Sequence, residues 1–214
     1  MRTAFDGQLR ELRDAMISMG AMCEEAIAKA AKSFLENDLP LAAAVPALAE
    51  KIDRQEREIE SMCLKLLLKQ QPVAADLRVI SSALKMVTDL ERVGDQSADI
   101  AEIAKVCCLP EKAKSNEIHD MSLAVIKMVN DSVEAFLHSD AAEAEAVIRY
   151  DDVVDGFFDR IKKSLIADLR QDPQAGEYAI DLLMIAKYLE RIGDHAVNIA
   201  KWILFSISGR LDGV

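Results

Sequence analysis

Apolar residues recur at steps of three and four positions in six separate stretches of this chain. Such steps place the apolar side chains on one face of an α-helix, whereas a strand would show alternation. The six stretches cover residues 5–34, 41–66, 75–107, 118–136, 147–165 and 178–204. The pattern predicts an all-α protein built from six long helices.

Capping residues and prolines mark the ends of these helices. Asp38 stands where it can cap the second helix, with Pro40 in the first turn. Asp140 and Glu143 have the spacing of a capping box before the fifth helix. A proline follows both the second and the fifth helix. Because the connections are short, we expect successive helices to be antiparallel.

The chain also contains an internal repeat. The hexapeptide LERVGD at residues 90–95 returns 99 residues later as LERIGD at residues 189–194. Further matches, such as Asp53 with Asp155, have an offset of 102 residues. The repeat predicts two tandem three-helix bundles of a usual domain size. We place the bundles at residues 1–108 and 117–214, with a charged linker at residues 109–116.

The repeated hexapeptide brings carboxylates into a helix face that is otherwise apolar. Glu91 and Asp95 lie one helical turn apart on the third helix, and Asp99 extends the row by another turn. Glu190 and Asp194 repeat the pair on the sixth helix. A glycine stands between the two acids of each pair, and it would let a neighbouring helix approach closely.

The second and fifth helices add further acids. Asp151 and Asp155 are four residues apart on the fifth helix, whereas the equivalent residues of the second helix are Ala49 and Asp53. The candidate metal ligands are therefore Asp53, Glu91, Asp95, Asp99, Asp151, Asp155, Glu190 and Asp194.

Several carboxylates on adjacent helices repel one another at neutral pH. A bound cation, a raised pKa or a paired basic group relieves such repulsion. Oxygen ligands suit metals such as Mg, Mn, Fe or Zn. The alternative is that the acids pair at the surface with basic neighbours, namely Arg92, Arg191, Lys85 or Lys187.

Catalysis has little support in the sequence. Glycine stands three residues after each glutamate, so the Glu-x-x-His pattern of ferritin-like metal sites is absent. His195 has Gln96 as its repeat partner, and we expect it to pair or pack rather than to bind a metal. No nucleophile beside a histidine and no phosphate-binding glycine loop is recognisable. We therefore expect a protein that is not an enzyme.

Composition narrows the classes of partner. The net charge of −11 argues against nucleic acid and suits cations or a basic protein surface. No apolar run is long enough for a transmembrane helix, and the start of the chain lacks an apolar signal core. The four cysteines include an adjacent pair and no C-x-x-C motif, which favours a reduced, cytoplasmic protein.

The chain resembles the PhoU family of phosphate-uptake regulators over essentially its whole length. The segments that carry the resemblance are residues 70–78 (QQPVAADLR), the first hexapeptide, and residues 190–199 (ERIGDHAVNI). The resemblance implies surface multinuclear clusters of divalent or trivalent metal ions, bound by Glu/Asp-x-x-x-Asp pairs. The matching pairs are Glu91 with Asp95, Glu190 with Asp194, and Asp151 with Asp155. Ala49 breaks the remaining pair beside Asp53.

The resemblance also implies a negative regulator of the phosphate-starvation response. The implied partners are the ATPase subunit of a phosphate ABC transporter and a PhoR-type sensor histidine kinase, which would hold the protein at the inner face of the membrane. We also expect a homodimer. Two other classes stay open: a carboxylate-bridged metal-dependent enzyme, and an acidic helical scaffold without metal. Turnover assays with Mn or Fe and elemental analysis would separate the three classes.

Overall fold

A computed structural model describes residues 2–70, 72–107 and 116–210 of the chain. Within these ranges it contains six α-helices, one short 3-10 helix and no strand. The elements are α1 (Arg2–Glu36), α2 (Leu39–Gln70), α3 (Ala74–Val106), α4 (Asn116–His138), α5 (Ala141–Gln171), η1 (Pro173–Ala175) and α6 (Gly176–Ser208). The predicted all-α class and the six helices are confirmed. Residues 109–115 of the expected linker lie outside the described residues, and Asn116 opens α4.

The turns after α1 and α4 share one geometry. Asn37 and Ser139 occupy equivalent places in the repeat and have φ angles of 55° and 53°. This left-handed conformation ends each helix. The next residue, Asp38 or Asp140, accepts a hydrogen bond from a backbone N–H in the first turn of the following helix, at 2.9 Å in α2 and 2.8 Å in α5. The two predicted caps are therefore confirmed.

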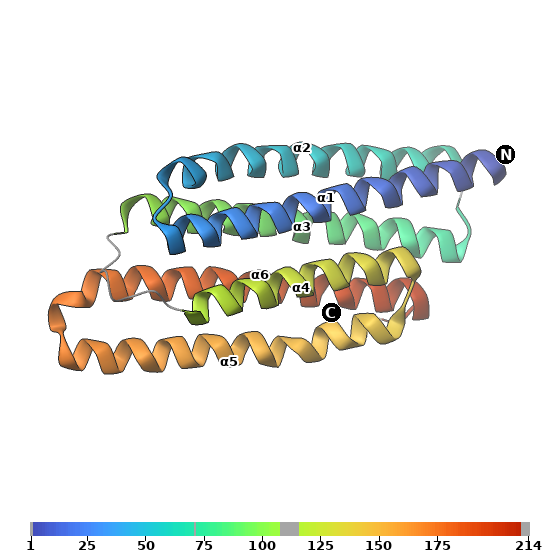
Figure 1. Ribbon diagram of the computed structural model, residues 1–214. Coiled ribbons are helices and arrows are strands. Elements are labelled where there is room, and N and C mark those ends of the chain that lie inside the picture. Colours follow the sequence, from blue (N-terminus) through green and yellow to red (C-terminus); the bar gives the residue numbers. More distant parts are fainter. Residues whose placement is uncertain (1, 71, 108–115, 211–214) are drawn as a thin grey trace.

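The six helices form two three-helix bundles that pack side by side (Figure 1). Helices α1, α2 and α3 contact one another, as do α4, α5 and α6. Between the bundles α1 packs on α4 and α3 packs on α6, whereas α2 and α5 contact only elements of their own bundle. Facing helices of the two bundles run in opposite directions, so the α2–α3 and α5–α6 connections lie at opposite ends of the molecule.

The apolar core runs through both bundles. The large side chains that are fully buried include Leu12, Met16, Met19, Ile27, Phe34, Ile52, Ile59, Leu66, Ile80, Met86, Leu90 and Ile100. On α5 the buried residues form a single narrow row, whereas on α6 they extend around more of the helix because this helix faces both bundles. No described helix carries an apolar stretch long enough to cross a membrane.

The contact between α1 and α4 includes a glycine that has no room for a side chain. A Cβ atom added to Gly20 would lie 2.8 Å from Cγ2 of Val133. Val133 is buried and β-branched, so its methyl group has little freedom to move away. Gly20 therefore sets how closely the two bundles can pack.

We expect Gly20→Ala to destabilise the protein by about 1–2 kcal/mol, measured by urea unfolding. Overpacking against Val133 should outweigh the roughly 0.5–1 kcal/mol that alanine gains over glycine in a helix. Gly7→Ala is the matched control, because a Cβ atom there meets nothing within 4 Å, and it should stabilise. The double variant G20A/V133A should lose less than the sum of the two single losses. Wild-type stability in Gly20→Ala would contradict this expectation.

Candidate functional site

The acidic pairs of α3 and α6 lie where a second helix of the same bundle passes close by. A Cβ atom on Gly94 would lie 3.1 Å from Cδ1 of Ile52, which belongs to α2. A Cβ atom on Gly193 would lie 3.3 Å from Oδ1 of Asp151, which belongs to α5. The close approach that the two glycines predicted is confirmed. In the second bundle it brings the carboxylate of Asp151 against the helix that carries Asp194.

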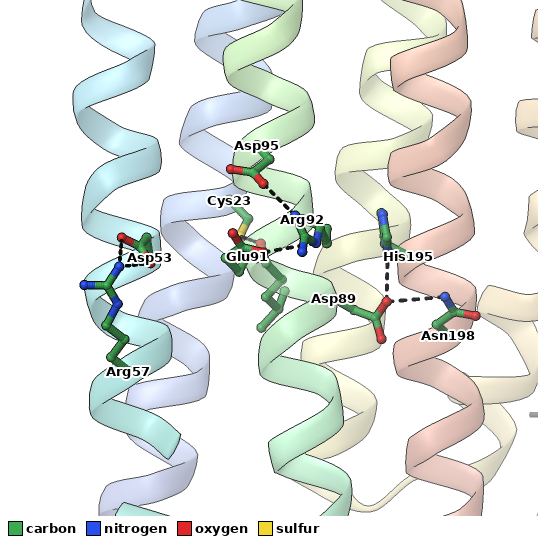
Figure 2. A network of polar contacts seen from close by, with 10 residues as sticks. Cys23, Asp53, Arg57, Asp89, Glu91, Arg92, Asp95, His195 and Asn198 are labelled. Atoms are coloured by element: carbon green, nitrogen blue, oxygen red, sulfur yellow. Dashed lines mark hydrogen bonds and ion pairs between the residues drawn. The ribbon is translucent and has the colours of Figure 1, made fainter. Parts of the chain in front are cut away.

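In the first bundle the acids pair with arginines of their own helices (Figure 2). On α3 the guanidinium of Arg92 lies 3.4 Å from the Glu91 carboxylate and 3.1 Å from that of Asp95. On α2 Arg57 donates hydrogen bonds of 2.9 and 2.8 Å to the two carboxylate oxygens of Asp53. Glu91 is the more enclosed acid of its pair, since its side chain is 16% exposed and that of Asp95 is 48% exposed.

The arginines do not remove the repulsion between these acids. The pKa of Glu91 is raised to about 7, first by burial and then by the negative charge of Asp95, although Arg92 acts in the opposite direction. Burial and the charge of Glu60 raise the pKa of Glu56, a neighbouring acid on α2. A proton or a cation near Glu91 would therefore stabilise the folded chain.

Asp99 lies one turn beyond Asp95 on α3, and charged groups of both bundles act on its pKa. Its pKa is raised by burial and by the charge of Asp95, and it is lowered by Arg191, which belongs to α6. The structure thus places Asp99 under the influence of a basic residue from the other bundle as well as of the acidic pair.

In the second bundle two of the predicted acids act on a third, Asp151. The pKa of Asp151 is raised to about 6, first by burial and then by the charges of Asp155 and Asp194. Glu190, whose side chain is 17% exposed, forms an ion pair with Lys187 on its own helix. Asp151 on α5 is therefore close enough to Asp155 and to Asp194 of α6 for their charges to act on it, and Glu190 has a lysine as its partner.

As the side chains lie, no group of three or more His, Cys, Asp or Glu residues within the described ranges is arranged to hold a metal ion. Arg92 and Lys187 pair with the acids as the surface-pair alternative predicted. The donors are nevertheless oxygens of the kind that hard cations prefer, and burial together with the charges of Asp155 and Asp194 raises the pKa of Asp151, although Lys201 acts in the opposite direction. Metal binding by the eight predicted residues stays a prediction.

A polar contact that the repeat did not reveal joins the two bundles (Figure 2). On α6 His195 Nδ1 donates to Oδ1 of Asp89 at 2.9 Å, and Asn198 donates to the same oxygen at 3.3 Å. The His195 and Asp89 side chains are only 18% and 15% exposed. The expected pairing role of His195 is thus realised. The repeat partner of Asp89 is Tyr188, so comparison of the two copies does not single it out.

Both the sequence and the fold of this chain are similar to those of known proteins. The PhoU domain family matches the chain twice, at residues 16–104 and 118–203. A phosphate-specific transport system accessory protein PhoU homolog from Pseudomonas aeruginosa is 32% identical over 96% of this chain and 86% of its own length. The homolog from Synechocystis is 34% identical over 98% of this chain and 93% of its own length.

Solved structures agree with this similarity. The crystal structure of PhoU from Pseudomonas aeruginosa matches with a TM-score of 0.90 and 32% identity, covering 96% of this chain and 100% of that one. The phosphate transport system regulatory protein PhoU from Streptococcus pneumoniae also matches with a TM-score of 0.90, at 26% identity, covering 98% of this chain and 100% of its own. Both comparisons extend over the two bundles.

The raised pKa of Glu91 leads to a pH dependence of stability in metal-free protein. The folded chain binds the Glu91 proton more tightly than the unfolded chain does. The stabilising contribution of Glu91 is therefore complete below the ordinary pKa of 4.5 and is lost as pH rises through about 7. Glu91→Gln should show a shallower fall in the free energy of unfolding over this range and should be more stable than wild type at pH 8.

Urea unfolding in EDTA at several pH values measures this effect. Glu145→Gln serves as the control, because Glu145 is an exposed partner of Arg149 and should leave the wild-type slope in place. The expectation is wrong if Glu91→Gln keeps the wild-type dependence on pH.

Proposed function

The chain belongs to the PhoU family, and on that premise we propose that it is a negative regulator of phosphate uptake and of the phosphate-starvation response. The observation that carries the proposal is that the two family matches coincide with the two bundles, one within α1–α3 and one within α4–α6. The relatives are named as accessory proteins of phosphate-specific transport systems. Their names support a role for this chain in phosphate transport.

We propose that the protein acts by binding other proteins. Its partners would be the ATPase subunit of a phosphate ABC transporter and a PhoR-type sensor histidine kinase, and it would work as a homodimer. The net charge of −11 favours contact with basic surfaces of such partners and disfavours nucleic acid. In this proposal the protein is cytoplasmic, and its partners hold it at the inner face of the membrane.

We further propose that the acids of the second bundle bind a divalent or trivalent metal ion, such as Fe, Zn, Mn or Mg. Asp151, Asp155, Glu190 and Asp194 would hold the ion. The ion would supply positive charge that neutralises the acids and ties α5 to α6. The oxygen donors and the mutual repulsion around Asp151 support this assignment.

Removing two of these acids should abolish most of the stabilisation by metal. Wild-type protein saturated with metal at about 100 times the Kd should gain about 2.7 kcal/mol, or roughly 5–10 °C in Tm, over protein kept in EDTA. E190Q/D194N should lose most of this rise, because it lacks two of the four ligands. Differential scanning calorimetry with and without metal measures the rise. A wild-type Tm that metal removal leaves unchanged would favour surface ion pairs over a metal site.

The regulatory role makes a prediction in the cell. A clean deletion should leave phosphate-starvation genes expressed in medium rich in phosphate, and the wild-type gene should restore repression. Reporter transcription in both media measures this effect. Complementation with E190Q/D194N, checked for normal protein level, reports whether the acids of the second bundle contribute to repression. Normal repression in the deletion strain, with no paralogue present, would reject the regulatory proposal.

A further inference from the structure

The two bundles carry acidic residues at equivalent places of the repeat, so each bundle serves as a reference for the other. With the repeat offset of 102 residues, Ala49 of the first bundle corresponds to Asp151 of the second. With the same offset, Arg57 corresponds to Asp159. The first bundle thus lacks one acid and has a cation where the second bundle has another acid.

The arginines of the first bundle are in direct contact with its acids. One guanidinium nitrogen of Arg57, Nη2, donates to both carboxylate oxygens of Asp53, at 2.9 and 2.8 Å, in an ion pair at the surface of α2. Arg92 lies within ion-pair distance of both Glu91 and Asp95. Three of the four predicted ligands of the first bundle, namely Asp53, Glu91 and Asp95, therefore already have a guanidinium partner (Figure 2).

The equivalent places of the second bundle differ. Arg191 is the repeat counterpart of Arg92, yet it acts on Asp99 of the other bundle. At the close approach of the helices, Gly193 meets the carboxylate of Asp151, whereas Gly94 meets the apolar side chain of Ile52. The second bundle therefore presents an oxygen ligand at the point where the first presents a methyl group.

We propose that the carboxylate cluster of the first bundle holds no metal ion, and that Arg57 and Arg92 take the place of the cation there. The proposal rests on the proposed metal site of the second bundle for its contrast. A metal ion in the first bundle would have to displace two guanidinium groups from their carboxylates. It would also lack one ligand, because Ala49 stands where the second bundle has Asp151. The arginines are held on the same helices as the acids, so they are always present at high local concentration.

Metal content of substituted full-length chains tests the proposal. Each protein is stripped with EDTA, dialysed and titrated with Mn²⁺, and bound Mn²⁺ is measured by electron paramagnetic resonance. E91Q/D95N should keep the Mn²⁺ content of wild type, whereas E190Q/D194N should lose most of it. Loss of bound Mn²⁺ from E91Q/D95N would overturn the proposal.

The reciprocal experiment gives the first bundle the residues of the second. A49D/R57D should bind more Mn²⁺ than wild type, because it restores the missing ligand and removes the competing cation. Circular dichroism checks that this variant folds, and Arg57→Asp alone replaces it if it does not. If the variant folds but binds no more Mn²⁺ than wild type, these two positions do not exclude the metal, and the proposal fails.

If wild type binds no Mn²⁺, only the proposed metal site of the second bundle is rejected. A thermal measurement then still tests the proposal for the first bundle. In EDTA, R57Q/R92Q should lower the Tm by about 1–3 °C, because the acids of the first bundle lose their cations. Added Mn²⁺ should restore this loss. Arg149→Gln, which removes an exposed pair with Glu145 on α5, is the control and should change the Tm less. No fall in Tm, or a fall that Mn²⁺ does not reverse, would overturn the proposal.

Discussion

Burial of apolar surface on both sides of four helices is the constraint on which this molecule depends. Helices α1, α3, α4 and α6 each face their own bundle and the other bundle, so their apolar rows are wide. Helices α2 and α5 contact only elements of their own bundle, and on α5 the buried residues form a single narrow row. The apolar packing of α3 and α6 also holds each acidic pair beside an outer helix, and the glycine within each pair allows the distance to be short.

The acidic clusters show how a duplicated unit can solve one electrostatic problem in two ways. Carboxylates held on packed helices repel one another, and the fold retains them only if a proton or a cation reduces that repulsion. In the first bundle arginines of the same helices supply the positive charge, while Glu91 keeps a raised pKa. In the second bundle an acid stands in place of Arg57, and we propose that a metal ion supplies the charge there. The two copies would then share a fold and differ in their need for metal.

Much of this arrangement could be predicted from the sequence, because it is local. The period of the apolar residues predicted the six helices, and the aspartates that follow α1 and α4 predicted the N-caps of α2 and α5. Gly94 and Gly193 predicted the close approach of neighbouring helices. Contacts between the bundles could not be predicted, since periodicity defines the face of a helix and not its partner. The pairing of Asp89 with His195 joins residues more than a hundred positions apart. Likewise, the spacing of Arg57 and Asp53 allows their pairing but does not require it.

The short turns within each bundle and the polar contact between bundles bear on the order in which the chain folds. Within a bundle, neighbouring helices follow one another closely along the chain, so little loop-closure entropy opposes their pairing. The contact of Asp89 with His195 and Asn198 spans 106 and 109 residues, and its closure costs more loop entropy than pairing within a bundle. Folding is thus expected to proceed bundle by bundle, followed by docking. The internal repeat fits such an order, because each copy contains three helices that contact one another.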